Sequence, residues 1–420
     1  MDANLTNEFN GLLHKLLAAH NAASDVLFVP GKPPQVEIHG VLEAPEIGEG
    51  ILSGERVEKF ARGIINGHVK LQQDLANTGA CDCSYALADT CRFRVNLYKQ
   101  NGQHALVMRR LSSQVPTLDS LNLPPAFKHL TAEKNGLVFV TGGTGNGKTT
   151  TLAALLNEIN ATSKVHVVTL EDPIEFLHPQ LKSTFSQREL NRDFFSFPDG
   201  LRSALRQAPK VILVGEIRDR ETMEIALTAG ETGHLVVTTM HTNSADQTIH
   251  RILGFFGKDE EQLVRERLAG SLRYIVGQRL VPKKNGGRLL VTELMGSSLR
   301  TREAIEMGEN ENRRLHEIIE AGQSQGWHSF EQSLMHAFEA DLITEATAMT
   351  HSINKPTMRQ RLDIAKGQRL QRPSKAMPAV PMMVVAAAEI LPLPPLCEPL
   401  PAPKPPPPPS LLMGIMNSFM

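Results

Sequence analysis

The 420-residue sequence has few cysteines and few aromatic residues, and its charges balance. Four cysteines without a C-x-x-C pair argue against a disulfide framework and against a tetracysteine zinc site. With 44 basic and 45 acidic residues the formal net charge is -1, so no global field attracts nucleic acid or an anionic membrane. One tryptophan and three tyrosines provide no evident platform on which bases could stack. We therefore expect no nucleic-acid partner.

The sequence also lacks a long apolar run. No window reaches the roughly 18 uninterrupted apolar residues that a membrane span needs, and the first ten residues lack the basic start and apolar core of a signal peptide. These absences predict a cytoplasmic protein. At 420 residues the chain is long enough for two or three domains with cores of their own.

Element patterns divide the chain into four parts. Residues 1–112 predict a small α+β unit, and residues 113–130, which contain three prolines, predict a linker. In residues 131–370 strands and helices alternate, which predicts an α/β domain with a largely parallel sheet and a helical C-terminal part after about residue 250. Residues 371–420 hold 14 of the 27 prolines and predict a disordered tail.

The most informative segment is residues 136–151, GLVFVTGGTGNGKTTT, in which an apolar strand leads into a glycine-rich loop and then a helix. The loop matches G-x-x-x-x-G-K-[ST], whose glycines let backbone N–H groups turn toward phosphate oxygens at a helix N-terminus. Lys148 is expected to reach the β- and γ-phosphates of ATP, and Thr149 to hold Mg²⁺. The predicted nucleotide-binding residues are Gly142, Gly143, Thr144, Gly145, Asn146, Gly147, Lys148, Thr149 and Thr150.

Three further segments follow predicted strands, whose carboxyl ends meet at one edge of a parallel sheet. TLEDPIE (169–175) carries three carboxylates that suit Mg²⁺ or water, unless it is only a charged turn. In VILVGEIRD (211–219), Glu216 lies just past a buried strand and could orient the water that attacks the γ-phosphate. His234 and His241 bracket the third strand, and His241 is the better placed to sense the γ-phosphate, although either could be an ordinary hydrogen-bonded histidine.

In this order the segments resemble the motifs of the type II and type IV pilus secretion ATPase superfamily, most closely those of the PilT-like pilus retraction ATPases. GGTGNGKT is similar to their Walker A loop, TLEDPIE to the Asp box, VILVGEIRD to the Walker B motif, and ETGHLVVTTMHTNSA to the His box. The likeness extends from about residue 5 to residue 365. It implies a RecA-like P-loop NTPase domain preceded by a smaller α+β, PAS-like domain.

The resemblance also implies a function. Family members are hexameric ATPases that use ATP and Mg²⁺ to power pilus retraction and twitching motility, working on an inner-membrane platform protein at the cytoplasmic face of that membrane. By motif match, Glu216 is the catalytic glutamate, Glu175 is a Mg²⁺ or water partner, and His234 and His241 are the His-box pair. Arg94 and Arg109 match arginines that close over the phosphates, unless they only bridge surface carboxylates.

Departures from the family pattern keep other functions open. The AIRNLIRE motif linked to retraction is barely recognisable in residues 299–307, where only Arg302 and Ile305 fit. The alternative is therefore an accessory pilus ATPase, or a type IV secretion-system ATPase, that does not drive retraction by itself. Gly215 stands where many nucleotide hydrolases have an aspartate, which leaves the carboxylate chemistry to Glu216 and the earlier acidic segment. A nucleic-acid motor and a scaffold that binds ATP without turnover remain as other classes.

Overall fold

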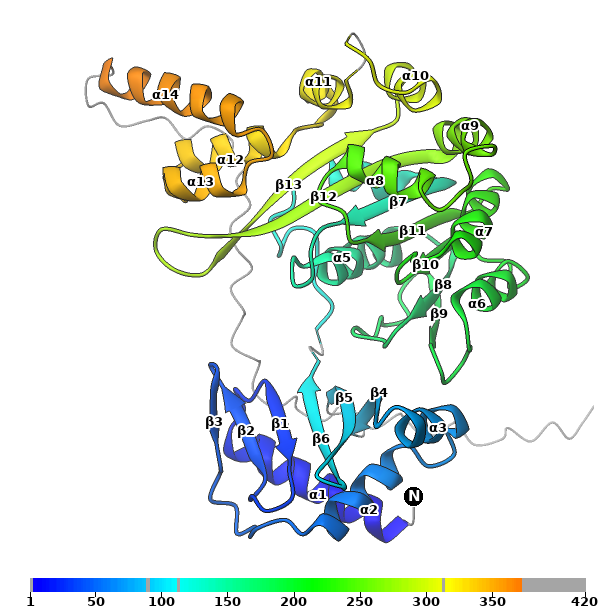
Figure 1. The fold of residues 1–420 in the computed structure, drawn as a ribbon, viewed down its shortest axis with the longest axis vertical. Helices are drawn as coiled ribbons and strands as arrows, with labels where there is room; N and C mark the ends of the chain where they lie inside the picture. Colours follow the sequence, from blue (N-terminus) through cyan, green and yellow to red (C-terminus); the bar gives the residue numbers. More distant parts are fainter. Residues whose placement is uncertain (1–2, 88–90, 112–113, 312–313, 372–420) are drawn as a thin grey trace, which may run out of the picture.

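The computed structural model describes residues 3–87, 91–111, 114–311 and 314–371. The described chain forms a six-stranded sheet toward the N-terminus and a seven-stranded sheet after it, each with a buried core of its own (Figure 1). This is the mixed α/β architecture that the alternating elements predict. The predicted proline-rich tail lies outside the described residues, apart from Gln371 at the end of the last helix.

The N-terminal sheet is antiparallel, in the order β3-β2-β1-β6-β5-β4. Its strands are β1 (Asp25–Phe28), β2 (Gln35–Ile38), β3 (Val41–Glu43), β4 (Ala80–Leu87), β5 (Cys91–Gln100) and β6 (Gln103–Arg110). Helices α1 (Ala3–Ala19), α2 (Gly54–Ile64) and α3 (Val69–Asn77) complete the unit. On α1 the buried residues at positions 9, 12, 13, 16 and 17 have helical spacing, so one stripe of the helix packs into the core.

The side chains of strand β5 alternate between the core of this unit and a polar face of its sheet. Phe93, Val95 and Leu97 are buried in the core. Because successive side chains of a strand point to opposite faces, Arg92 and Arg94 lie together on the other face. Arg109 of β6 is paired with Arg94 in the register and therefore lies on that face too. The sheet thus groups three arginines on its polar side.

The expected linker is mostly part of the larger unit. Leu118, Leu121 and Leu123 are buried in the core of the seven-stranded sheet, followed by α4 (Phe127–Ala132) with Phe127 and Leu130. The prolines at 116, 124 and 125 drew attention to a connecting segment, whereas the leucines between them anchor it to the domain that follows. A free connection between the two sheets is therefore much shorter than 113–130.

The seven-stranded sheet has the order β13-β12-β7-β11-β10-β8-β9 and is parallel except for β13, which runs antiparallel to β12. Its elements are β7 (Gly136–Thr141), α5 (Lys148–Thr162), β8 (His166–Glu171), β9 (Thr184–Glu189), α6 (Phe197–Ala204), β10 (Val211–Val214), α7 (Arg220–Glu231), β11 (Leu235–Met240), α8 (Ala245–Leu253), α9 (Glu261–Ser271), β12 (Leu272–Pro282) and β13 (Arg288–Gly296). The chain leaves β7 for β8 in one direction and returns through β10 to β11 in the other. Right-handed crossovers then place α5 and α7 on opposite faces of the sheet.

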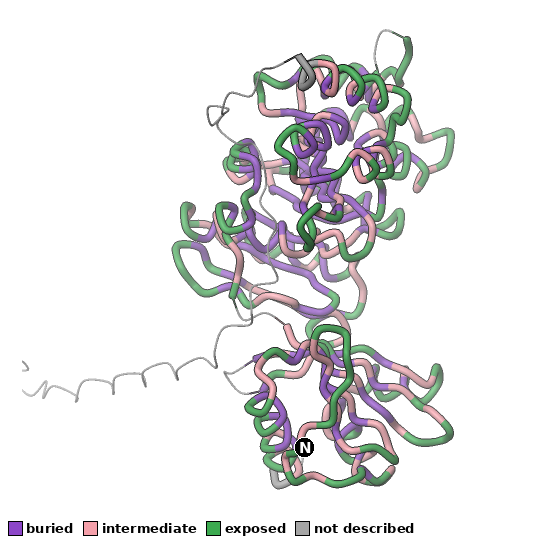
Figure 2. The backbone as a smooth tube through the Cα atoms, turned by 90° about the vertical axis from the view of Figure 1, so that its left-hand side faces the viewer, coloured by how far each residue is buried: buried purple, intermediate pink, exposed green. Residues whose placement is uncertain are grey.

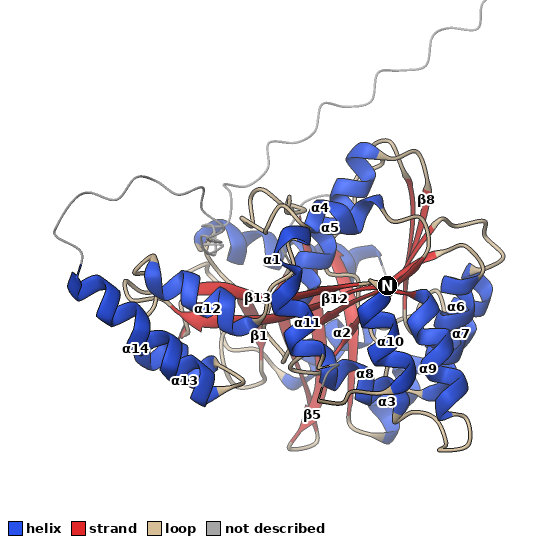
Figure 3. Ribbon diagram, turned by 90° about the horizontal axis from the view of Figure 1, so that it is seen from above, coloured by secondary structure: helices blue, strands red, loops and turns tan. Residues whose placement is uncertain are grey.

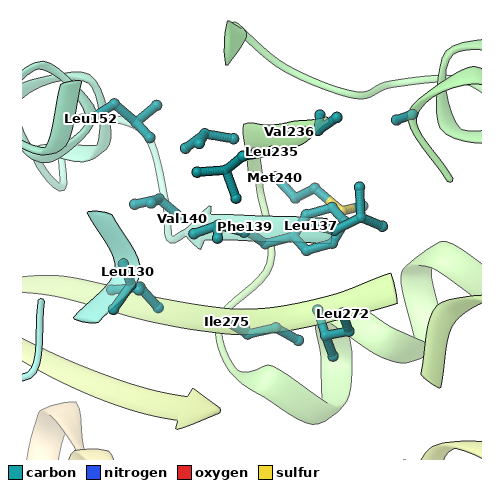
Figure 4. Packing of buried hydrophobic residues seen from close by; sticks show 14 of the residues in the cluster. Leu130, Leu137, Phe139, Val140, Leu152, Leu235, Val236, Met240, Leu272 and Ile275 are labelled. Atoms are coloured by element: carbon teal, nitrogen blue, oxygen red, sulfur yellow. The ribbon is translucent and has the colours of Figure 1, made fainter. Parts of the chain in front are cut away.

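The central strands are apolar because both faces of the sheet are covered. Every residue of β7, β10 and β11 is buried. Figure 4 shows Leu137, Phe139 and Val140 of β7 between side chains of β11 and β12. Figure 2 shows the buried residues concentrated in the interior of this unit. The core therefore holds rigidly the strand ends that carry the functional motifs.

The expected helical part after about residue 250 also contains two strands. After α8 and α9 the chain adds β12 and β13 to the sheet, on the far side of β7. The sequence LRYIVGQRLVP of β12 mixes charged and apolar residues, so neither strict alternation nor a continuous apolar run marks it as a strand. Strand β9 (TFSQRE) was missed for a similar reason, since it is a polar strand at the sheet edge.

The remaining helices are α10 (Leu299–Met307), α11 (Leu315–Ala321), α12 (Phe330–Glu339), α13 (Glu345–His351) and α14 (Lys355–Gln371). Helices α12 to α14 pack with Val281, Leu289 and Val291 of the β12–β13 hairpin in a third core. Figure 3 shows these three helices at the β13 end of the sheet, away from α6, α7 and α9. Within the part of the chain that the structure describes, no helix has the length and apolar character that crossing a membrane requires.

Candidate nucleotide-binding site

The glycine-rich loop connects the carboxyl end of β7 to the first residue of α5, as the sequence predicts. Gly142, Gly145 and Gly147 have φ values of 146°, 77° and 79°, which favour glycine. At Gly142 a Cβ atom would also lie 2.5 Å from the backbone oxygen of Gln278, so any side chain there would collide with β12. The loop can therefore bring its backbone N–H groups close to a phosphate, next to the positive end of α5.

Lys148 lies across this loop. Its Nζ donates hydrogen bonds to the backbone oxygens of Gly142 at 2.8 Å and Gly143 at 3.0 Å. Burial lowers the pKa of Lys148, and the carboxylate of Glu216 opposes that change. The ammonium group is thus half-buried within the loop, near the glutamate that follows β10, which is the position that its predicted role requires.

Strand β12 supports the loop through Gln278 and Leu280, two residues for which the sequence analysis predicts no role. The backbone N–H of Leu280 donates to Asn146 Oδ1 at 3.2 Å, and Gln278 Nε2 donates to Thr151 Oγ1 of α5 at 2.7 Å. Gln278 is fully buried. A buried amide requires partners, and Gln278 finds one in α5, but no local pattern in β12 marks it for this role.

Glu175 joins the loop from the acidic segment after β8. Burial raises the pKa of Glu175, whereas Arg94, a hydrogen bond with the Thr149 hydroxyl, and Arg109 act in the opposite direction. Thr149 and Glu175, the two residues expected to hold magnesium, therefore lie close to each other. The guanidinium groups of the N-terminal sheet act on the same carboxylate, which places parts of both sheets around one point.

Two other carboxyl groups of the acidic segment have different surroundings. Glu171, the last residue of β8, is buried, and burial raises its pKa to about 7 despite hydrogen bonds from Thr169 Oγ1 at 2.6 Å and Gln187 Nε2 at 3.2 Å. Burial also raises the pKa of Asp172, opposed by Arg218 and then Arg94. Burial thus raises the pKa of all three neighbouring acids, and Glu175 is the one on whose pKa the Thr149 hydroxyl acts.

Glu216 lies beyond the carboxyl end of β10, with one oxygen paired to Arg218. Its other oxygen, Oε2, is 3.6 Å from Nε2 of His241 and is buried without a hydrogen-bond partner among the described residues. Burial lowers the pKa of His241, and the neighbouring Lys148 lowers it further. A buried carboxylate oxygen that faces an imidazole and a lysine is suited to accept a hydrogen bond from water or substrate.

The structure separates the two predicted histidines. His241 follows the carboxyl end of β11 and joins Glu216, whereas His234 precedes the amino end of that strand. There the Nδ1 of His234 lies 3.1 Å from the backbone oxygen of Ala229 in α7. Because the six residues of β11 separate the two side chains, His234 does not join this site within the chain. The two histidines bracket this strand as the sequence predicts, and only the motif match groups them in one site.

Arg94 and Arg109 lie opposite each other on β5 and β6. Arg109 Nε donates to Asp25 Oδ1 at 2.9 Å, and most of the Arg109 side chain is exposed. Both arginines act on Glu175, and Arg94 also acts on Asp172. Within one chain, the N-terminal sheet therefore presents guanidinium groups to the acidic segment.

These groups fit a nucleotide phosphate chain with a hard metal ion. Thr149, Glu175 and Glu216 supply oxygen atoms, the ligands that Mg²⁺ prefers, while Lys148 and the arginines supply positive charge. Across the described ranges, no group of three or more His, Cys, Asp or Glu side chains could hold a metal ion by itself. A magnesium ion here would therefore share its coordination with phosphate oxygens and water, as Mg²⁺ commonly does.

Comparison with known proteins identifies the family of this chain. The sequence pattern described as type II/IV secretion system protein matches residues 84–365. The chain belongs to this family. A twitching motility protein of Neisseria gonorrhoeae is 38% identical over 328 residues, which cover 77% of this chain and 86% of that protein. The type IV pilus retraction ATPase PilT of Pseudomonas aeruginosa is 38% identical over 331 residues, or 79% of this chain and 94% of PilT.

A solved structure of a related protein has the same fold as this chain. The crystal structure of the pilus retraction motor PilT with bound ADP superposes with a TM-score of 0.76 and 37% identity, covering 84% of this chain and 98% of that one. The predicted resemblance to the secretion ATPase superfamily, and to its PilT-like members in particular, is therefore confirmed. The predicted nucleotide binding agrees with a family in which a solved member holds ADP.

Proposed function

We propose that this chain is a motor that hydrolyses ATP to ADP and phosphate and uses the energy to retract type IV pili. The prediction of an ATPase is confirmed by family membership together with a relative named as a retraction ATPase. Retraction, with twitching motility as its consequence, follows from relatives that align over most of their length. One observation carries the proposal. At the carboxyl ends of the parallel strands, Lys148, Thr149 and Glu175 lie close to the Glu216–His241 pair.

Each residue has a role that its surroundings support. Residues 142–150 bind the phosphates through backbone N–H groups and Lys148, and Thr149 with Glu175 would hold Mg²⁺, which neutralises phosphate charge when bound. Glu216 uses its unpartnered Oε2 to orient the attacking water, and His241 lies beside that oxygen. Arg94 and Arg109 add positive charge around the phosphates as the two sheets close.

The architecture of the working motor is part of the same proposal. We assign a PAS-like domain to residues 1–112, a short linker that ends before Leu118, and a RecA-like ATPase domain with a helical C-terminal part that begins at Leu118 and extends to residue 370. The separate cores of the two sheets support this division. We further propose a homohexamer that acts on an inner-membrane platform protein from the cytoplasmic face. Domain closure around ATP would supply the mechanical step.

The second candidate is an accessory pilus or secretion ATPase that does not retract pili by itself. The segment 299–307 favours it, because the family's retraction motif is almost absent there. The segment still forms helix α10, capped by Ser298 and Thr301, with Ile305 buried and with Leu299 and Met307 exposed. The segment thus forms a capped helix in which only Arg302 and Ile305 fit the retraction pattern.

One genetic experiment separates the two candidates. A strain that lacks its pilus retraction ATPases is supplied with this chain alone, and pilus shortening is scored together with twitching. Retraction restored by the wild type, but not by Glu216→Ala, supports the main proposal. ATP hydrolysis by the purified chain without any retraction supports the accessory function instead.

A further inference from the structure

A buried carboxylate connects the two sheets of this protein. Glu189, the last residue of β9, is 4% exposed. Its Oε1 accepts a hydrogen bond from Ser84 Oγ of β4 at 2.7 Å, and its Oε2 accepts one from Arg92 Nη2 of β5 at 3.3 Å. Arg92 Nη2 also donates to Ser84 Oγ at 2.9 Å. The seven-stranded sheet, called the ATPase sheet from here on, therefore inserts one side chain into a polar site on the N-terminal sheet.

The same carboxylate also holds the acidic segment. Oε2 of Glu189 accepts a hydrogen bond from the backbone N–H of Ile174 at 3.2 Å, and Ile174 directly precedes Glu175. The backbone of Glu189 is fixed in turn, because its N–H donates to Asp193 Oδ2 at 2.8 Å. A single carboxyl group thus contacts the N-terminal sheet on one side and the neighbour of a proposed magnesium ligand on the other.

The N-terminal partners of Glu189 are the immediate neighbours of Arg94. Arg92 and Arg94 are two positions apart on β5 and share one face, and Ser84 is paired with Arg94 across the β4–β5 ladder. Fixing Arg92 and Ser84 therefore fixes the part of the β5 backbone from which Arg94 extends. This is also the arginine with the largest charge effect on the pKa of Glu175.

From this geometry we infer that Glu189 is a positioning residue, which holds the polar face of the N-terminal sheet against the acidic segment so that Arg94 acts on the nucleotide of its own chain. The inference rests on the proposed function of the site. Interfaces between domains of one chain permit relative motion by default, so a buried hydrogen-bonded carboxylate is a means of selecting one orientation. Removing it leaves Arg92, which is largely buried, without its carboxylate partner.

The test measures ATP hydrolysis by the full-length chain in wild-type, Glu189→Ala, Arg94→Ala and doubly substituted forms. Misplacing a catalytic group by about 1 Å can cost about 10²-fold, so we expect kcat to fall by about that factor in Glu189→Ala with a smaller change in KM for ATP. If Glu189 acts through Arg94, the double variant has the same kcat as Arg94→Ala alone. Equal fold losses from Glu189→Ala in both backgrounds would overturn the inference.

Hydrogen exchange gives a readout that does not depend on turnover. In Glu189→Ala we expect faster exchange at the Ile174 amide and along β4 and β5, with unchanged protection in β7, β10 and β11. Glu189→Gln keeps one acceptor oxygen and should lie between wild type and Glu189→Ala. Unchanged exchange at Ile174 and in β4 and β5 would contradict the proposed link. Loss of protection throughout the central strands would show that the alanine variant is unfolded, and the glutamine variant then decides.

A matched control comes from Glu320 in α11. Its carboxylate accepts a hydrogen bond from Ser329 Oγ at 2.7 Å and pairs with Arg361 at 2.7 Å, so Glu320→Ala removes the same chemical group from the same kinds of partner without touching the N-terminal sheet. We expect its kcat to stay near the wild-type value. If the wild type itself hydrolyses no ATP, the proposed function fails, while the exchange experiment still decides whether Glu189 links the two sheets.

Discussion

The two sheets contribute to the candidate site in different ways. The ATPase sheet places Lys148, Glu216 and His241 at the ends of strands that are buried on both faces, so one continuous core fixes their positions. The N-terminal sheet contributes Arg94 and Arg109 from its polar face, outside its own core. Phosphate binding can therefore be organised within one domain, whereas the arginines depend on how the two domains are oriented.

Loss of a group from the ATPase sheet should have the largest effect. Lys148→Ala and Glu216→Ala each remove a side chain that we propose acts on the phosphates or the attacking water, and we expect kcat to fall by at least about 10³-fold. Steady-state phosphate release by purified protein measures this. Thermal unfolding of each variant should stay close to that of the wild type, because neither side chain is part of the apolar core. Near-normal turnover in either variant would remove that residue from the mechanism.

Substitution of the arginines of the N-terminal sheet should have a smaller effect on kcat. Arg94→Ala should lower kcat by about 10²- to 10³-fold, and Arg109→Ala by less, because Arg109 has a smaller effect on Glu175 and is already paired with Asp25. Affinity for a fluorescent ADP analogue, which needs no hydrolysis, should change little in Arg94→Ala.

Mixing variants tests whether Arg94 serves its own chain. When Arg94→Ala subunits are mixed with Lys148→Ala subunits, an arginine that acts on its own chain gives no activity beyond the average of the two. Activity well above that average would mean that Arg94 reaches the nucleotide of a neighbouring subunit. The wild type mixed with Lys148→Ala controls for subunit exchange.

The sequence predicted the ATPase sheet better than its surroundings, for physical reasons. Residues 137–140, 211–214 and 235–237 are continuous apolar runs, which are typical of strands buried on both faces, and the motifs follow closely after them. Local pattern therefore located Lys148, Glu175, Glu216 and His241. It failed for β9 and β12, because their mixture of polar and apolar residues matches neither the alternating nor the continuous apolar pattern of a strand.

Long-range contacts account for the residues that were missed or misplaced. Gln278 contacts Thr151 across 127 positions, and Glu189 contacts Ser84 across 105, so no local spacing marks either residue. His234 is the opposite case, since a local motif groups it with His241 while the strand between them separates the two. Motifs identify residue types reliably, but sheet topology decides which of them meet.

The two ends of β11 provide a smaller and more direct test. His241→Ala removes the imidazole 3.6 Å from Glu216, and we expect kcat to fall by about 10- to 10²-fold. His234→Ala, at the other end of the same strand, should leave kcat of the isolated chain near wild type because its contacts are to α7. The pair is matched in residue type and strand, so equal losses in both variants would contradict the separation of the two histidines.

The smallest expected effect concerns the stability of the acidic segment. Burial raises the pKa of Glu171 to about 7, so the folded protein retains a proton that the unfolded chain loses near its ordinary value of 4.5. The contribution of Glu171 is therefore fully present below about pH 4.5 and is lost as the pH rises toward 7. Glu171→Gln keeps the group neutral, and we expect it to gain about 1 to 3 kcal/mol relative to wild type between pH 5 and pH 8. Urea unfolding of both proteins at these two pH values measures the gain. The same difference between the proteins at both pH values would show that Glu171 does not titrate in this range. Its carboxyl group would then be better hydrated than the buried strands that support the acidic segment.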